Sequence, residues 1–514
     1  MRTCLIYISI SILVASGISC RKDFEYSVSM GNLEFSKDTV FLDTVFSNIG
    51  SSTYTLKVFN RSKEDISIPI IGLAEGEQSG YRLNVGGGAG KVFTDVPIMA
   101  KDSLFIFIET TFDVSEREMN EYLYTDVLQF DKGDNLQKIP LITLIRDAVF
   151  LFPSNTSYGV KENIILGLDT NGEEIRAKGF ELSEDQLTFT NAKPYVIYGY
   201  AVVPEKKTLR IDAGVRVHFH KDSGILVRPE SILQINGELS SDSLALEKEV
   251  IFEGDRLEPE FENVPGQWGG IWIAHGSTGN TIDHLTVKNA TIGLRVEGDG
   301  VLQTPTMTIK NTQIYNSSRF NLWGISAFIK GENLVLGSAG ANSLYCNLGG
   351  DYSFVHTTIA NYWTDSFRNG AALTIDNKKI DLSGIEYNYN LTRANFQNCI
   401  IDGNGEVELI LNSNGSNTFN YYFSNCLIRF DKKNEEPNDD SLYDFDDLDK
   451  YLDNLINEKV KFKDAIKGDF RLTPSSPAID NADVETALSV PLDILGIDRT
   501  KLPEIGAYEF KIEN

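Results

Sequence analysis

The larger, C-terminal part of this sequence consists of short apolar runs that each begin or end at a glycine or an asparagine. Typical runs lie at 224–227, 231–237 and 250–254. A run of this length is too short to bury its own apolar side chains, so it is stable only when similar runs stack above and below it. Stacked runs joined by turns at fixed corners form a solenoid of parallel strands. We therefore expect a parallel β-helix over residues 193–511.

Asparagines mark the corners of this predicted helix. Four of them close strings in which an apolar residue stands two places earlier: Asn289, Asn311, Asn398 and Asn425. Asparagine accepts a left-handed backbone, and its amide can bond the asparagine of the next coil. The interval between the last two fits one coil with a loop. The pattern predicts a column of bonded asparagines along the helix.

An acidic insertion near 431–453 interrupts the pattern, because it is rich in Asp and Glu and contains no glycine. Apolar residues then recur at helical spacing, at Leu442, Phe445, Leu448, Leu452 and Leu455. This spacing predicts a polar loop followed by a short amphipathic helix. We expect that helix to cover the open C-terminal end of the solenoid, where bare strands would otherwise pair with other chains.

The N-terminal part, at 33–147, contains short strand-like runs with a period near two, such as 54–59 and 103–108. Turn residues separate the runs, and no helical pattern competes with them. This arrangement predicts an antiparallel β-sandwich. Residues 148–192 are expected to connect it to the solenoid. The whole chain is therefore predicted to be all-β.

The first twenty residues have the pattern of an export signal. Arg2 precedes an apolar run that is too short to span a bilayer, and small residues follow it. The end, Gly17-Ile18-Ser19-Cys20, resembles a bacterial lipobox. That resemblance implies a signal peptide at 1–19, a lipid on Cys20 and a linker over 20–32. The alternative is an ordinary secretory signal in which Cys20 is incidental.

Several strings resemble right-handed parallel β-helix lipoproteins of Bacteroidetes, which have a pectate-lyase-like superfamily fold. They lie at 265–273, 276–284, 354–363, 470–480 and 496–509. The string at 35–59 resembles the immunoglobulin-like domains that begin surface lipoproteins of the same phylum. The resemblance implies a right-handed β-helix behind an immunoglobulin-like sandwich. Because Arg21 follows the cysteine, it also implies an outer-membrane lipoprotein that faces the periplasm or the cell surface. Fold alone assigns no activity.

The charge and the cysteines exclude some classes of function. The chain has 47 Lys and Arg against 73 Asp and Glu, a formal charge of −26, which repels phosphate backbones. We expect no nucleic-acid partner. Cys346, Cys399 and Cys426 form neither a disulfide framework nor a CxxC metal motif, so no metal or cofactor is expected. We expect Cys399 and Cys426 to stack inside the helix; a disulfide between them is the alternative.

No catalytic residues emerge from the pattern. The adjacent aspartates at 439–440 and 446–447 both fall in the acidic insertion, where a solvated loop explains them. The string Ile282-Asp283-His284 resembles a lyase signature but also fits an ordinary rung. His218 and His220 alternate along a strand and share a face, yet no third metal ligand accompanies them.

Aromatic residues suggest a binding role. A sugar-stacking platform could be formed by Trp268, Trp272, Trp323, Tyr362 and Trp363; packing in the core or in loops is the alternative. We expect a non-catalytic cell-envelope protein that binds a glycan or another surface protein along a face of the helix. One alternative is a carbohydrate-active polysaccharide lyase or glycoside hydrolase. Another is a structural or adhesive spacer.

Overall fold

The chain folds into two compact units, Met1–Asp147 and Ala148–Asn514. The computed structural model describes 26–47, 49–112, 121–155, 161–168, 173–242, 245–300, 303–380, 384–431 and 440–511. Cys20 and the predicted signal peptide lie outside the described residues. Strands dominate both units, which confirms the prediction of an all-β chain. Within the described part, no helix has the length and the apolar character that crossing a membrane requires.

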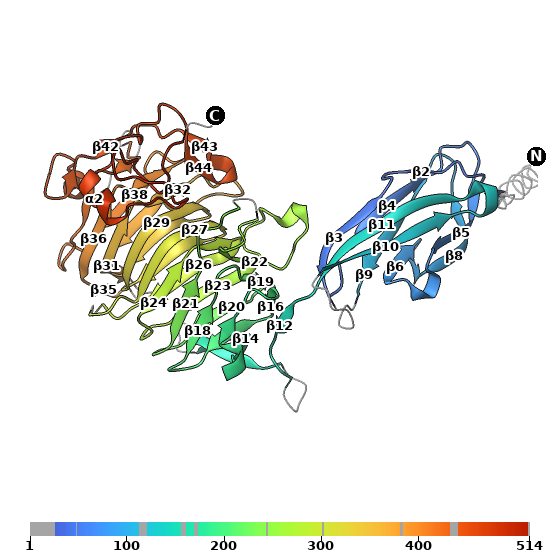
Figure 1. Cartoon of the computed structure of the whole chain (residues 1–514), viewed down its shortest axis with the longest axis horizontal. Helices are drawn as coiled ribbons and strands as arrows, with labels where there is room; N and C mark the ends of the chain where they lie inside the picture. The colour runs from blue at the N-terminus through green and yellow to red at the C-terminus, as the bar shows by residue number, and fades with distance from the viewer. Residues whose placement is uncertain are drawn as a thin grey trace, which may run out of the picture. The chain divides into compact units, whose positions relative to one another are not determined.

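The first unit is a sandwich of two sheets around one core (Figure 1). One sheet contains β1 (Ser27–Val28), β5 (Ile66–Leu73), β8 (Val92–Ile98), β10 (Glu121–Phe130), β11 (Gln137–Arg146) and β3 (Val40–Phe46). The other contains β2 (Glu34–Phe35), β4 (Tyr54–Phe59), β9 (Ser103–Thr110), β6 (Tyr81–Val85) and β7 (Gly88–Gly90). Most pairings are antiparallel, as predicted, but β1 on β5 and β3 on β11 are parallel.

Alternation of side chains explains this core. Leu56 and Val58 are buried in β4, and Ile106 and Ile108 are buried in β9, with Leu56 directly opposite Ile106. The residues between them point outward, since successive side chains of a strand face opposite sides of the sheet. The period of two in the sequence therefore gives each sheet one apolar face, and the two faces meet.

The second unit is a stack of coils whose strands pair in parallel (Figure 1). Each coil contributes one strand to a ten-stranded sheet, except that a hairpin of the first coil contributes two. The strands are β13 (Asn163–Leu168), β14 (Glu174–Glu181), β17 (Tyr200–Val203), β20 (Gly224–Val227), β23 (Trp268–Ile273), β26 (Ala290–Glu297), β28 (Phe320–Ile325), β30 (Asn342–Asn347), β33 (Leu373–Asp376) and β38 (Leu409–Asn412). Only β13 pairs antiparallel, on β14. This repetition makes the second unit a parallel β-helix.

A nineteen-stranded sheet forms the other sides of the coils. Its first strands are β12 (Val149–Leu151), β15 (Thr188–Phe189), β16 (Tyr195–Ile197), β18 (Thr208–Ile211), β19 (Arg216–Phe219), β21 (Ile232–Asn236), β22 (Val250–Gly254), β24 (Asn280–Asp283) and β25 (Leu285–Lys288). It continues through β27 (Met307–Ser317), β29 (Phe328–Ala339), β31 (Gly350–Val355), β32 (Thr358–Asn361), β36 (Leu391–Gln397), β37 (Ile400–Gly403), β39 (Tyr422–Ser424), β40 (Leu427–Ile428), β41 (Tyr451–Leu452) and β42 (Leu455–Ile456).

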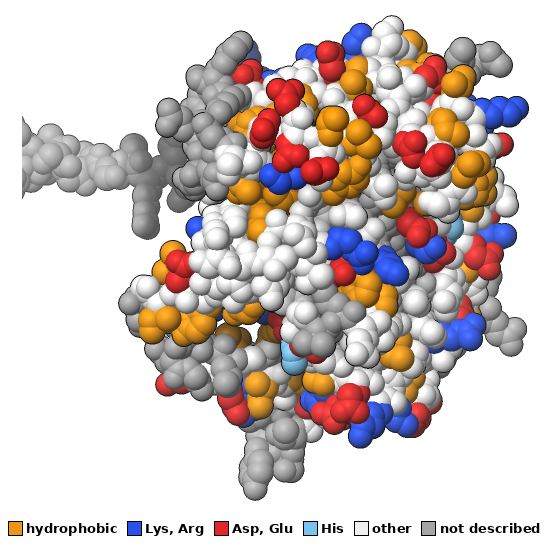
Figure 2. Space-filling model, turned by 90° about the vertical axis from the view of Figure 1, so that its left-hand side faces the viewer, with side chains coloured by type: hydrophobic (Ala, Val, Ile, Leu, Met, Phe, Trp, Pro, Cys, Tyr) orange, Lys and Arg blue, Asp and Glu red, His pale blue; other side chains and the backbone are white. Residues whose placement is uncertain are grey.

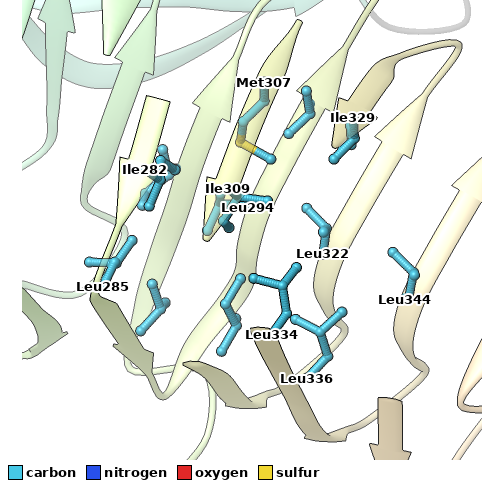
Figure 3. Close-up of a cluster of buried hydrophobic side chains, with 14 of the residues drawn as sticks. Ile282, Leu285, Leu294, Met307, Ile309, Leu322, Ile329, Leu334, Leu336 and Leu344 are labelled. Atoms are coloured by element: carbon cyan, nitrogen blue, oxygen red, sulfur yellow. The ribbon is translucent and has the colours of Figure 1, made fainter. Parts of the chain in front are cut away.

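The interior of the helix is filled by columns of equivalent residues. Leu294, Leu322 and Leu344 occupy one position in successive coils and are fully buried (Figure 3). Burial of each such side chain contributes about 1.5–3 kcal/mol. Rings form a second column further along, with centroids 5.4, 5.1 and 5.6 Å apart, made of Phe354, Phe396, Phe423 and Tyr451.

The predicted asparagine corners are confirmed. Asn311 has a φ of 46°; its amide donates to Asp283 at 2.9 Å and it accepts from the amide of Asn333 at 3.0 Å. Asn289 accepts from the amide of Asn316 at 2.7 Å in the same manner. These bonds link one coil to the next at two different corners.

The first coil begins earlier than the sequence indicated. Within 148–192, the expected connecting segment, β12 pairs with β16 and β15 pairs with β18. The β13–β14 hairpin of this segment joins the ten-stranded sheet. These strands are short and separated by polar residues, so only their pairing shows that they belong to the β-helix.

The prediction of an amphipathic helix at 442–455 is wrong. A 3-10 turn at Asp440–Tyr443 precedes β41 and β42, which add two further parallel strands to the solenoid. β41 and β42 each contain two apolar residues, and the distance between the two strands in the sequence resembles the spacing of an amphipathic helix. Coverage of the core is still achieved, because Phe445 packs on Tyr451 with ring centroids 4.7 Å apart.

The C-terminal segment packs against the outside of the nineteen-stranded sheet. It includes the β43 (Phe462–Asp464) and β44 (Asp469–Leu472) hairpin and α2 (Val484–Ser489). Phe470, Ala507 and Tyr508 cluster with Val335 and Ala360, which point out of the helix. The segment therefore covers the outward face of several later coils.

Candidate functional site on the ten-stranded sheet

The outward face of the ten-stranded sheet presents one column of aromatic and cationic side chains. Strand pairing places Trp272 of β23 beside Arg295 of β26, then Trp323 of β28 and Tyr345 of β30. Neighbouring strands lie about 4.8 Å apart, so side chains at one position stack. We call these four residues the Trp272 column.

Contacts within the column are close. The guanidinium carbon of Arg295 lies 3.9 Å from the ring centroid of Trp272 and 5.0 Å from that of Trp323. The rings of Trp323 and Tyr345 are nearly parallel, with centroids 6.3 Å apart. Arg295 also forms an ion pair with Glu297. A cation–π contact at a partly exposed site contributes about 0.5–2 kcal/mol, so the column is held in place by its own stacking.

A cavity of about 440 Å³ opens at Trp272. Leu166 and Ile175 of the β13–β14 hairpin form one wall, and Trp272, Arg295 and Glu297 form another. A larger hollow, of about 700 Å³, shares Leu166, Trp272 and Glu297 with it. Trp272 is half-buried and stands where the two spaces meet. We call these two spaces together the Trp272 groove.

The hairpin determines where the groove begins. Ile164 of β13 packs against Val202 and Leu226, which are the outward residues of the first coils. This apolar contact covers the sheet up to Leu226. Trp272 is the next residue in the same row and packs only in part against this cluster, so part of its side chain stays exposed.

Glycines bring the floor of the groove close to neighbouring backbone. Gly270 has a φ of 147°, and a Cβ atom there would lie 1.8 Å from the carbonyl oxygen of Ile292. At Gly269 a Cβ atom would lie 2.3 Å from the Tyr200 hydroxyl. The two glycines that follow Trp268 are therefore required by this packing.

Two donors in the wall lack acceptors among the described residues. They are Nε1 of Trp272 and Nε of Arg295, and both atoms are buried. A buried donor without a partner costs about 1–3 kcal/mol.

A polar network lies beside the far end of the column. The Tyr345 hydroxyl donates to Asp376 at 2.6 Å, and the Asn347 amide donates to the same carboxylate at 2.9 Å. Trp323 Nε1 donates to Asn347 at 3.4 Å. Burial raises the pKa of Asp376, and burial together with the negative Asp376 raises the pKa of Tyr345. The network fixes the orientation of both rings.

The five predicted aromatic residues do not form one platform. Trp268 is buried, stacks on Phe219 with centroids 4.2 Å apart and donates to the Lys288 carbonyl. Trp363 is also buried and donates to Ser366. Tyr362 belongs to the other side of the helix, under the C-terminal segment, and donates to Asp402 at 2.7 Å.

Only Trp272 and Trp323 of the predicted set lie together. Sequence reasoning missed Arg295 and Tyr345, which complete the column. Strand register was the missing signal, because it alone shows that these four residues occupy one position in successive coils. In the sequence, Trp272 and Trp323 alternate with apolar neighbours as residues of any half-exposed strand do, so the local pattern does not distinguish them.

The other residues that sequence reasoning had weighed take structural roles. His284 is a corner residue whose Nδ1 lies 2.7 Å from Asp283. His218 is buried beside Glu253, whereas His220 is exposed and contacts Asp255. In the described ranges no group of three His, Cys, Asp or Glu side chains could hold a metal ion.

The three described cysteines are buried and form no disulfide, as expected for Cys399 and Cys426. Of the paired aspartates, Asp447 forms an ion pair with Lys450 at 2.9 Å. Asp439 lies outside the described residues. None of these groups lines the Trp272 groove.

Comparison with known proteins assigns no family. No protein family profile matches the chain, and no curated protein matches it. Among solved structures, the periplasmic chaperone SfaE is similar to 22% of this chain, at 15% identity and a TM-score of 0.15. The match spans 57% of the chaperone chain. A likeness this slight supports neither a fold nor a function.

Proposed function

We propose that this chain is a non-catalytic envelope protein that binds a glycan in the Trp272 groove. The observation that supports this most is the position of Trp272, half-buried between two open spaces with Arg295 stacked on its ring. Indole rings pack against the C–H faces of sugars, while a few polar groups fix the hydroxyls. Glu297 and Arg295, which both line the smaller cavity, supply such polar groups.

Binding without cleavage is favoured by the state of the carboxylates. Glycoside hydrolysis uses two carboxyl groups on opposite sides of the scissile bond. Glu297 lines both spaces and pairs with Arg295; Glu162, Glu181 and Glu205 also line the larger space. Glu162 accepts a hydrogen bond from Ser154, and Glu181 pairs with Arg228. Asp376, near the other end of the column, is bonded to Tyr345 and Asn347. The carboxylates nearest Trp272 and Tyr345 are thus held by other side chains, which favours binding over cleavage.

The cellular context is part of the same proposal. The lipobox-like end at Cys20 and the resemblance to Bacteroidetes lipoproteins with a pectate-lyase-like fold support a lipid anchor in the outer membrane. More than one acyl chain anchors a protein stably. The groove would then present a polysaccharide site at the cell surface or in the periplasm.

A glycan array on the full chain, followed by calorimetric titration of the glycan that it retains, tests the proposal. Trp272→Ala should weaken binding about tenfold or more, since tenfold corresponds to about 1.4 kcal/mol. Phe367→Ala is the matched control, because Phe367 is 90% exposed and lies outside the groove. Its affinity should equal that of the unaltered chain.

Incubation of the retained polysaccharide with the chain, followed by analysis for new reducing or unsaturated ends, decides between binding and cleavage. We expect no products. Products would replace the proposal with a lyase or hydrolase. Failure of the unaltered chain to retain any glycan, or equal affinity in Trp272→Ala, would reject the glycan site.

A further inference from the structure

A hollow of about 600 Å³ at the start of the β-helix has a lining of opposite charge to the chain as a whole. Lys161, Arg176, Lys178 and Lys221 line it, against the single carboxylate of Asp222. The chain carries a formal charge of −26. On the face shown in Figure 2, acidic, basic and apolar side chains are interspersed. We call the space lined by these four cations the basic hollow.

Part of the basic hollow is rigid. The ring of Tyr198 stacks on that of His220 with centroids 4.5 Å apart, and Nδ1 of His220 lies 2.7 Å from Asp255. Arg176 donates to Asn163 at 2.8 Å and pairs with Glu174. These contacts fix one wall and the floor, so a ligand would not have to order them.

Asp222 is the one carboxylate that lines the hollow beside the remaining cations. Lys161, Lys178 and Lys221 are exposed, and none of them forms an ion pair with a described residue. Three ammonium groups around one concave space repel each other, and an anion placed among them relieves that repulsion. Lysine donors suit both carboxylate and sulfate oxygens.

The basic hollow adjoins the Trp272 groove. Arg176 lines the basic hollow and also the larger space beside Trp272. Both spaces follow the β13–β14 hairpin, which contributes Lys178 to the first and Leu166 to the second. A ligand that extends along the hairpin therefore meets an aromatic ring and a cluster of cations.

We propose that the basic hollow binds the anionic group, a carboxylate or a sulfate, of an acidic glycan whose uncharged part packs on Trp272. This inference rests on the proposed glycan site and specifies the class of glycan that the site takes. It also explains how a strongly acidic chain overcomes its repulsion of an acidic polymer: the attraction is local and acts within about one Debye length, roughly 8–10 Å.

Paired probes test the charge requirement on the full chain. One pair is oligogalacturonate and its methyl ester; the other is dextran sulfate and dextran. We expect the charged member of at least one pair to bind about tenfold or more tightly than its neutral partner. We also expect its affinity to fall between about 50 and about 500 mM salt, because salt screens exposed charges. The pair that responds identifies carboxylate or sulfate.

Two charge reversals locate the site. The double variant Lys178→Glu with Lys221→Glu should lose this preference for the charged probe. The matched control is Lys467→Glu with Lys501→Glu, which changes the net charge equally at exposed positions of the C-terminal segment. The control should retain the preference. Thermal unfolding of both variants verifies that they fold.

The outcomes separate this inference from the proposed function. Equal binding of charged and neutral probes, with loss of both in Trp272→Ala, would overturn the basic hollow and leave the glycan site standing. A preference that survives in the Lys178 and Lys221 variant would overturn the location of the anion site. Failure of every probe and of the glycan array would overturn both proposals together.

Discussion

At the scale of single residues, the corner positions show what the sequence can and cannot reveal. Asparagine at a corner was predictable, because few residues accept a left-handed backbone. The same corner is filled by His284 and His356, with φ values of 45° and 47°. The string that contains His284 resembled a lyase signature, and only the backbone shows that both histidines take the place of asparagines.

Asn311 tests the corner column. Asn311→Ala loses the bonds to Asp283 and Asn333 and places a β-carbon in a left-handed conformation, so we expect a loss of about 2–3 kcal/mol in the free energy of unfolding. Asn311→Gly loses the same bonds without the steric strain and should cost less. Chemical denaturation measures both. A glycine variant less stable than the alanine variant would contradict this account.

His356 makes stability depend on pH. Nε2 lies 3.0 Å from the Asn398 amide and Nδ1 lies 3.3 Å from the Gly506 carbonyl, which suits a neutral ring. Burial and the nearby Arg499 hold the pKa of His356 well below its usual value. His356 therefore binds a proton near pH 6.5 in the unfolded chain but stays neutral in the folded chain. The free energy of unfolding falls as the pH decreases below that value.

The variant His356→Asn removes this proton and keeps a residue that suits the corner. Between about pH 7.5 and 5, the unaltered chain should lose about 1–2 kcal/mol more than the variant, since each unit below the unfolded pKa costs about 1.4 kcal/mol. Denaturation curves at the two pH values give this difference. Parallel losses in both chains would show that His356 is not the group responsible.

At the scale of elements, short strands were predictable but their partners were not. The runs at 224–227 and 250–254 became β20 and β22, since a short apolar run closed by glycine can only be buried by stacking. The β13–β14 hairpin was not foreseen, and the helix expected at 442–455 does not form. In both places the deciding information is the pairing of strands, which the order of residues alone does not contain.

Gly270 tests the geometry of β23. The register shifts between Gly270 and Ile271, and a β-carbon would collide with the Ile292 carbonyl. We expect Gly270→Ala to destabilise the chain by about 3 kcal/mol or more, because backbone must move. Gly279→Ala is the control, since nothing lies within 4 Å of a β-carbon there and only the positive φ opposes it. It should cost about 1 kcal/mol.

At the scale of the whole molecule, the sequence predicted two all-β units but not how the second unit uses its faces. The C-terminal strings at 470–480 and 496–509 suggested only a further part of the helix. They instead cover the nineteen-stranded sheet, and Phe462 and Phe470 of this segment pack on Tyr362. The ten-stranded sheet keeps an open row at Trp272. Coverage depends on contacts between residues far apart in sequence.

Phe470 tests that coverage. It is 1% exposed and packs on Phe462 and Tyr362, so Phe470→Ala should lower the free energy of unfolding by about 3–5 kcal/mol. Ile466→Ala, in the same segment but 70% exposed, should change it by less than about 0.5 kcal/mol. Equal effects from the two variants would mean that the segment is not docked on the helix.

A crystal structure of the chain with the glycan that the array retains is the most direct measurement of the central claim. We predict a sugar ring against the exposed part of Trp272, between the β13–β14 hairpin and β23, with an acidic group directed toward Arg176 and Lys178. The account would be contradicted by sugar bound on another face with the groove empty. It would also be contradicted if Trp272 and Trp323 did not occupy the same row of the sheet.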